Sequence, residues 1–247
     1  MLRDTIADQG NWLFRWRSYV LLVFIPLGVN AIRTPEAVEA AFGSGADLLW
    51  ELSCIGLAFV GLGIRALTIG HTPHGTSGRN TREQIAETLN TTGMYSIVRN
   101  PLYLGNAIIY MAIALFTQNL TFVLTMALFL VAYLERIVAA EERFLAAKFG
   151  ERYREWTARV PAFVPRPSIW VAPALPFSFR NVLRREYSGF FAIIATVVVI
   201  DYAHEAFAEG ETQVGLAWSV FFPFGAVVYV VLRSLKKHTA LLAVEGR

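Results

Sequence analysis

Long apolar runs, separated by short polar segments, are the dominant pattern along this chain. The runs cover the ranges 19–32, 48–70, 102–117, 120–134, 187–200 and 214–231. A helix rises about 1.5 Å per residue and the hydrocarbon core of a bilayer is about 30 Å thick, so these runs approach or reach the length of a membrane span. The pattern therefore predicts an all-α fold, a polytopic membrane helix bundle of about six transmembrane helices.

The first and fourth runs differ from simple spans. Pro26 interrupts the first run, and a signal peptide is the alternative interpretation there, although the preceding polar arm, 1–17, is long for one. The fourth run continues without a helix breaker to Gly150, and glycine commonly caps helix C-termini. A helix over 120–149 is roughly 45 Å long, so its last turns are expected to project from the membrane into the cytosol.

Composition agrees with a membrane protein. Hydrophobic residues make up 55% of the chain and charged residues 17%, below the roughly 25% charged residues of soluble domains. The net charge of +3 gives no argument for a nucleic-acid partner. The sequence has a single cysteine, Cys54, inside an apolar run. One cysteine cannot form an intrachain disulfide or a zinc–cysteine cluster.

Basic residues are distributed unequally between the two sides of the predicted spans. Nearly all of them lie before the first span, between the second and third, between the fourth and fifth, and after the sixth, whereas the opposite loops contain only Arg33. The positive-inside rule therefore predicts a multi-pass protein with both termini in the cytoplasm. A bacterial inner membrane is the expected location.

The strongest local signal is the stretch 93–106, where a polar loop ends and an apolar helix begins. Asn100 is a suitable N-cap residue, and Pro101 suits the first helical position. Unpaired N–H groups and the positive end of the helix dipole are then expected beside Arg99, with Tyr103 in the next turn. These residues predict a pocket for a small anionic group at the membrane surface. An ordinary capped helix with an interfacial arginine and tyrosine is the alternative.

Two further polar clusters are expected on the same side of the membrane. Glu141 and Glu142 lie near the end of the fourth helix, where carboxylates can bind hydroxyl or amino groups, or simply pair with neighbouring basic side chains. The loop 71–82 is rich in hydroxyls, glycines and cations, and such a composition suits a phosphate group. A flexible loop that merely follows the positive-inside rule is the alternative there.

Four motifs together resemble the isoprenylcysteine carboxyl methyltransferase and phospholipid methyltransferase family. They are G-M-Y-S-I-V-R-N-P-L-Y-L-G at 93–105, E-E-x-x-L at 141–145, F-G-x-x-Y at 149–153 and R-V-P at 159–161. Their order and spacing match the family over about 93–165. The resemblance implies an integral-membrane enzyme with a cytoplasmic cofactor pocket, which takes S-adenosylmethionine from the cytosol and a membrane lipid or lipidated substrate from the bilayer.

The resemblance also implies roles for individual residues. The cofactor-binding set is Arg99, Asn100, Pro101, Tyr103, Gly105, Glu141 and Glu142. Arg159 matches an arginine that the family places at the acceptor, so Arg159 and Glu142 are the expected catalytic residues. The family usually has histidine where this chain has Asn100, so Asn100 is expected to contribute a hydrogen bond and no proton transfer.

The chemical nature of the acceptor stays open. The loop with His71, Arg79 and Arg82 is similar to the corresponding loop of bacterial members of the family, including the lipid A 1-phosphate methyltransferase, and these three residues are the expected substrate contacts. An anionic phosphate or carboxylate needs no general base, whereas an amine requires one, with Glu142 or His71 as candidates. His71 and His74 lack an evident third ligand, so no metal site is predicted.

Three regions are predicted: N-terminal helices and a loop at 1–92, a catalytic core at 93–167, and a C-terminal helical pair at 168–247. The last pair either completes the bundle or lines a lipid entry and forms a homodimer contact. Two other functions remain open, a membrane reductase that uses NADPH and a non-enzymatic membrane scaffold or transporter.

Overall fold

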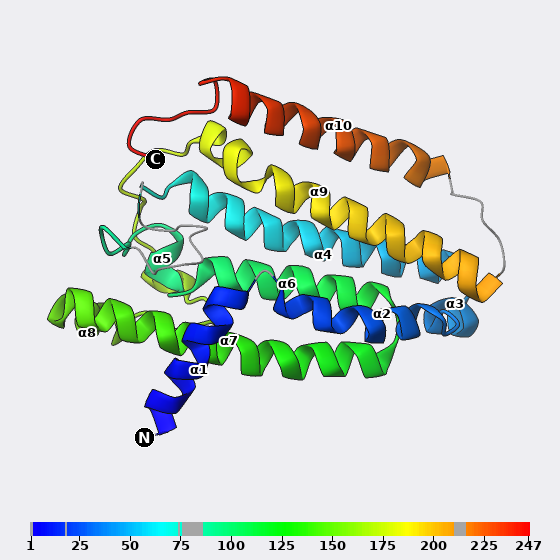
Figure 1. Cartoon of the computed structure of the whole chain (residues 1–247), viewed down its shortest axis with the longest axis horizontal. Coiled ribbons are helices and arrows are strands. Elements are labelled where there is room, and N and C mark those ends of the chain that lie inside the picture. The colour runs from blue at the N-terminus through cyan, green and yellow to red at the C-terminus, as the bar shows by residue number, and fades with distance from the viewer. Residues whose placement is uncertain (1, 18, 74, 76–85, 210–215) are drawn as a thin grey trace.

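A computed structural model describes residues 2–17, 19–73, 75, 86–209 and 216–247. All regular structure in these residues is helical (Figure 1). The elements are α1 (Leu2–Trp16), η1 (Val20–Phe24), α2 (Ile25–Ile32), α3 (Ala37–Phe42), α4 (Ser44–Gly70), α5 (Met94–Ile97), α6 (Pro101–Phe116), α7 (Leu120–Phe149), α8 (Glu151–Thr157), η2 (Pro167–Ile169), α9 (Phe179–His204), η3 (Glu205–Glu209) and α10 (Leu216–His238).

The predicted polytopic helical bundle is confirmed. Five helical stretches of the described chain are long and apolar enough to cross a membrane: Val20–Phe42, Ser44–Gly70, Leu120–Phe149, Phe179–Phe207 and Trp218–His238. The predicted third span is the shorter apolar helix Pro101–Phe116. Its 16 residues give about 24 Å, less than the hydrocarbon thickness, so α6 is a short helix enclosed between longer ones.

The helices of the bundle run side by side, in the order α10, α9, α4, α6 and α7 from top to bottom of Figure 1. Helices α4 and α6 approach each other closely at two glycines. A Cβ atom on Gly61 would lie 2.6 Å from the carbonyl oxygen of Gly105, and one on Gly105 would lie 2.7 Å from that of Gly61. The two helices therefore pack backbone against backbone, as small residues permit in membrane bundles.

An ionic contact joins α9 to this pair of helices. Arg65 of α4 donates to both carboxylate oxygens of Glu186 at 2.8 Å, and its third contact is Asn106 of α6, also at 2.8 Å. Side-chain exposure is 16% for Arg65 and 5% for Glu186, so the pair is largely removed from water. The contact connects the C-terminal helical pair to the part of the bundle that carries the motif at 93–105.

Some helix boundaries differ from the apolar pattern. The polar segment between the first two apolar runs, 33–47, contains α3 and the start of α4, because a charged residue in a helical turn does not end the helix. The fifth span starts earlier than expected, at Phe179, where the Ser178 hydroxyl accepts a hydrogen bond from the Asn181 N–H. By contrast, Gly150 ends α7 with a φ of 55°, which confirms the predicted cap.

The polar N-terminal arm is itself a helix, α1, which crosses α7 near the left end of the bundle in Figure 1. The crossing is tight, since a Cβ atom on Gly10 would lie 1.9 Å from the Arg136 carbonyl oxygen. Gln9 accepts a hydrogen bond from Arg136 at 2.9 Å, and Asp8 pairs with Arg143 at 2.6 Å. These contacts hold α1 across the projecting end of α7.

Candidate functional site

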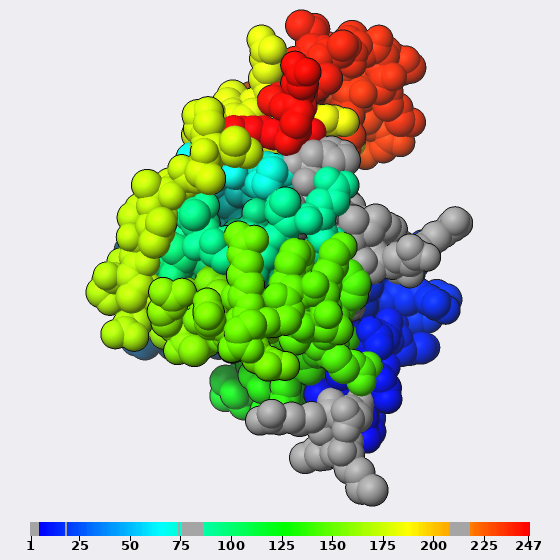
Figure 2. All heavy atoms as spheres, turned by 90° about the vertical axis from the view of Figure 1, so that its left-hand side faces the viewer, coloured from blue at the N-terminus to red at the C-terminus, as the bar shows by residue number. Residues whose placement is uncertain are grey.

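The elements that carry most of the predicted site residues meet at one end of the bundle, on the left in Figure 1: α5, the start of α6, the end of α7 and α8. In Figure 2, which faces this end, α7 and α8 (green) lie next to the following segment (yellow-green). Two backbone hydrogen bonds join that segment to the turn before α6. The Arg99 N–H donates to the Pro161 carbonyl at 2.9 Å, and the Arg166 N–H donates to the Ile97 carbonyl at 2.9 Å. The motif at 93–105 and the R-V-P motif are thus neighbours in space.

Arg99 and Glu142 form an ion pair between the start of α6 and the last turns of α7. Their nearest atoms, Nη1 and Oε1, lie 3.0 Å apart, with side-chain exposures of 19% and 29%. Arg99 also donates to the Tyr153 hydroxyl, and the Asn100 side chain donates to Glu142. Burial raises the pKa of Tyr153, so its hydroxyl stays protonated at neutral pH. The site contains three elements, α6, α7 and α8, held together by side chains.

A second carboxylate, Glu141, lies beside this pair and faces α6. The Tyr103 hydroxyl donates a hydrogen bond to it, and the positive charge of Arg17, just after α1, acts on both groups. The Arg17 guanidinium also lies 4.2 Å from the centre of the Phe14 ring. The docked N-terminal helix therefore brings a cation to the site, which the sequence alone did not predict.

Several polar atoms of this cluster are buried without a hydrogen-bond partner among the described residues. They are Nε of Arg99, Oε2 of Glu141 and Oε1 of Glu142. The Glu142 oxygen forms the ion pair with Arg99 but accepts no well-aligned hydrogen bond. Buried polar atoms are normally satisfied, so these three atoms are available to a ligand. One donor and two acceptors complement a molecule that carries both a carboxylate and hydroxyl or amino groups.

Asn100 departs from one expectation. It precedes α6, but its side chain makes no capping hydrogen bond to that helix, so the predicted N-cap contact is wrong. The amide instead donates to the Ala162 carbonyl at 3.2 Å and to Glu142. Pro101 occupies the start of α6 as predicted and is fully buried. Gly105 faces α4, where the neighbouring Arg65 stem would lie 2.6 Å from an added Cβ.

The remaining predicted residues lie apart from this cluster. The Arg159 side chain is exposed and donates to the Glu155 carbonyl at 3.3 Å. The nearby Pro161 and Ala162 carbonyls, by contrast, accept hydrogen bonds from Arg99 and Asn100. His71 caps the end of α4 and lines a separate cavity. Arg79, Arg82 and His74 lie outside the described residues.

Tyr153 was not among the predicted site residues, although it belongs to the F-G-x-x-Y motif. Its position in that motif was the available signal. No comparable signal exists for Arg17, because its approach to Glu141 depends on how α1 docks. The structure therefore brings together Arg99, Asn100, Tyr103, Glu141 and Glu142, and adds Tyr153 and Arg17 to them.

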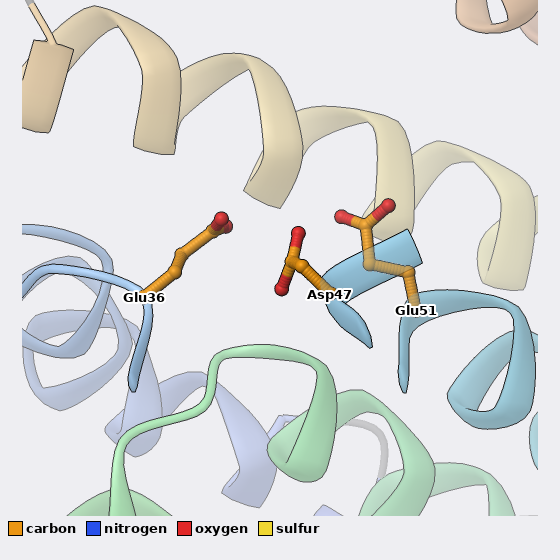
Figure 3. A group of neighbouring side chains, drawn as sticks. All are labelled: Glu36, Asp47 and Glu51. Atoms are coloured by element: carbon orange, nitrogen blue, oxygen red, sulfur yellow. The ribbon is translucent and has the colours of Figure 1, made fainter. Parts of the chain in front are cut away.

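At the opposite end of the bundle three carboxylates lie together, those of Glu36, Asp47 and Glu51 (Figure 3). One oxygen of each lies within 4.8 Å of the others, a spacing at which carboxylates can share a cation. Gln118 already donates to Asp47 at 2.6 Å, and His204 Nε2 lies 3.7 Å from Glu36. Asp47 of α4 thus contacts the turn before α7, and Glu36 lies near the end of α9.

Comparisons with known proteins bear on the end that carries Arg99. Residues 50–152, from α4 into α8, match the family model described as phospholipid methyltransferase. The chain is 31% identical over 125 residues to the cobalt-zinc-cadmium resistance protein CzcN of Cupriavidus metallidurans, which is 48% of this chain and 56% of that protein. No solved structure matches the chain significantly.

Two further relatives are named as methyltransferases. Methanethiol S-methyltransferase 2 of Bradyrhizobium diazoefficiens is 38% identical over 80 residues, 32% of this chain and 30% of that protein. Protein-S-isoprenylcysteine O-methyltransferase of Schizosaccharomyces pombe is 30% identical over 77 residues, 31% of this chain and 33% of that protein. The matches span about half, or less, of each of these curated relatives. The family match over residues 50–152 and the names of these two relatives confirm the resemblance seen in the sequence motifs.

Proposed function

We propose that this protein is an S-adenosylmethionine-dependent integral-membrane methyltransferase that transfers a methyl group to an anionic lipid or lipidated acceptor. The observation that carries the proposal is the cluster of Arg99, Glu141 and Glu142, whose buried atoms lack partners, at one end of a membrane bundle and inside the family match. The positive-inside distribution of basic residues supports a cytosolic position for this end, where the methyl donor is available.

The residues present fit the methyl donor. S-adenosylmethionine supplies an electrophilic methyl group on a sulfonium sulfur. Arg99 and the N-terminus of α6 suit its carboxylate, since a guanidinium and free helix N–H groups both favour an anion. Glu141 and Glu142 have acceptor oxygens for its hydroxyl and amino groups. Tyr103 and Tyr153 orient Glu141 and Arg99 through their hydroxyls.

An acceptor that is already an oxygen anion requires the fewest catalytic groups from this site. Methyl transfer is an in-line displacement, so alignment and the exclusion of water supply much of the catalysis, and an already anionic oxygen needs no base. Arg159 follows α8 beside the site and would orient such an anion, once its exposed side chain turns inward. The two relatives named as methyltransferases carry different acceptors in their names, a thiol and an isoprenylcysteine, so neither name is transferred to this chain.

The test uses the purified protein in lipid nanodiscs with methyl-labelled S-adenosylmethionine and a total bacterial lipid extract. We expect label in the lipid fraction and saturable calorimetric binding of S-adenosylhomocysteine, the demethylated product. Arg99→Met is expected to weaken that binding at least tenfold, whereas the surface substitution Arg154→Met leaves it unchanged. Absence of both lipid labelling and product binding would refute the proposal. Binding of NADPH instead would favour a reductase.

A further inference from the structure

A cavity of about 390 Å³ lies next to the site, between the end of α4, the stretch 88–95 and α8. Five threonines contribute to its wall: Thr68, Thr72, Thr88, Thr91 and Thr92. Among the described residues that line it, none is acidic and two are basic, Arg152 and His71. A wall of hydroxyls and cations without carboxylates favours an anion that accepts many hydrogen bonds.

Part of this polar wall is free to bind a ligand. Arg152 has no ion-pair or hydrogen-bond partner in the described part of the chain, whereas Arg154 of the same helix pairs with Glu151 at 3.1 Å. The side chains of Asn90 and Thr91 likewise have no hydrogen-bond partner among the described residues. The cavity thus presents one uncommitted guanidinium and two uncommitted neutral polar groups.

His71 is held in one tautomer. Its Nδ1 lies 2.9 Å from the Leu175 carbonyl oxygen, which can only accept, so the proton of the neutral ring is on Nδ1. The Phe177 ring packs edge-on at 5.3 Å and fixes the imidazole plane. Nε2 is then the ring nitrogen that can accept a proton from a ligand or, once protonated, donate to one.

The cavity and the proposed cofactor site share their walls. On α8, Arg152 lines the cavity, and the adjacent Tyr153 receives the hydrogen bond from Arg99. On the other side, Tyr95 lines the cavity, and its hydroxyl is influenced by the charge of Glu141. The cavity therefore borders the proposed methyl-donor site.

The cavity also lies at the level where a lipid head group is expected. Thr68, His71 and Thr72 belong to the last turn of α4 or follow it directly, and α4 is long and apolar enough to span the membrane. The ends of spanning helices lie in the head-group region. A lipid whose chains stay in the bilayer can therefore place its polar head group at the cavity wall.

From these observations we propose that the cavity binds the phosphate monoester of a lipid, which is the methyl acceptor of the adjacent site. The inference rests on the proposed function and specifies its substrate class. A phosphate monoester carries about 1.5 to 2 negative charges at pH 7 and three acceptor oxygens, which suit Arg152, Asn90 and Thr91. Nε2 of His71 adds one further hydrogen-bonding atom to this wall.

The reaction balances without any further reagent. One phosphate oxygen forms the new bond to the methyl carbon while the carbon–sulfur bond of the sulfonium breaks. The sulfur keeps the electron pair and becomes a neutral thioether, and the phosphate dianion becomes a methyl phosphodiester with one negative charge. No proton leaves the dianion, so the step needs no general base.

The test is calorimetric binding of dihexanoyl phosphatidic acid to the full-length protein in phosphatidylcholine nanodiscs. We expect saturable binding, with an affinity at least tenfold above that of inorganic phosphate because the lipid chains contribute. Arg152→Gln is expected to weaken lipid binding about tenfold, which corresponds to about 1.4 kcal/mol. Thr91→Val weakens it severalfold, and the matched surface variant Arg154→Gln stays within twofold of wild type. Affinity for S-adenosylhomocysteine is unchanged in all three variants.

Other outcomes would overturn the inference. They are no saturable lipid binding, equal losses for Arg152→Gln and Arg154→Gln, equal affinity for lipid phosphate and inorganic phosphate, or a parallel loss of S-adenosylhomocysteine binding in Arg152→Gln. Failure here is distinguishable from failure of the proposed function. A wild-type protein that binds S-adenosylhomocysteine and labels a carboxylate lipid would retain the methyltransferase proposal and exclude the phosphate acceptor.

Discussion

Nη1 of Arg99 lies 3.0 Å from Oε1 of Glu142, and this contact joins the start of α6 to the last turns of α7. Both side chains are largely but incompletely buried, with exposures of 19% and 29%. The pair is therefore neither a surface ion pair of little energetic value nor a sealed interior one. Its position lets a ligand reach both charges, which is what an exchangeable methyl donor requires.

Glu142→Gln is expected to weaken S-adenosylhomocysteine binding. The substitution keeps the side-chain size but removes the charge that orients Arg99, and a hydrogen bond to a charged group contributes about 1.5–3 kcal/mol, or roughly 10- to 100-fold in affinity. Calorimetric titration measures the change. Glu151→Gln, at an exposed surface pair, is the matched control and should have no effect. Equal affinities in wild type and Glu142→Gln would contradict the role of Glu142.

Arg159→Ala is expected to abolish most methyl transfer while it spares donor binding. The Arg159 side chain is exposed and contacts the Glu155 carbonyl, so its loss should leave the Arg99–Glu142 cluster intact. Labelled methyl incorporation should fall at least tenfold, as expected when one charge-assisted contact to an anion is lost. Arg154→Ala is the control on the same surface. A parallel loss of transfer and donor binding would assign Arg159 to the donor site instead.

Gly105→Ala should destabilise the bundle by about 1–3 kcal/mol, the usual cost of overpacking a close contact. The new methyl group would lie 2.7 Å from the Gly61 carbonyl oxygen, so α4 and α6 must separate. Thermal unfolding in detergent measures the change. Gly56→Ala is the matched control, because no atom lies within 4 Å of the added Cβ. Equal melting temperatures for the two variants would argue against the close α4–α6 packing.

Glu186→Gln should destabilise the protein more strongly, by about 3–5 kcal/mol, because it leaves the largely buried Arg65 without its counter-ion. The double variant Arg65→Met/Glu186→Gln is expected to recover part of that loss, since no unpaired buried charge remains. Thermal unfolding of Glu186→Gln, Arg65→Met and the double variant measures the interaction energy between the two residues. Additive losses would show that the two residues act independently.

The membrane bundle could be predicted from sequence because its signal is local. Apolar runs determine where helices cross the bilayer, and Gly150 marks the end of α7 by its positive φ. The group formed by Arg99 and Glu142 could also be predicted, since the order and spacing of the family motifs imply it. The start of α9 was missed because arginines interrupt the apolar run without interrupting the helix.

Long-range side-chain contacts could not be predicted. Arg65 and Glu186 find each other only once α4 and α9 are packed, and nothing in either segment indicates the partner. Asn100 likewise turns from the expected helix cap to the Ala162 carbonyl and Glu142, because the segment after α8 brings these acceptors close. Arg17 reaches the site for the same kind of reason, through the docking of α1 on α7.

The most direct measurement of the central claim is calorimetric titration of S-adenosylhomocysteine into the purified wild-type protein and its Arg99→Met variant. We expect one saturable site in the wild type and at least a tenfold loss of affinity in the variant. No binding to the wild type, or equal binding to both proteins, would contradict the central claim.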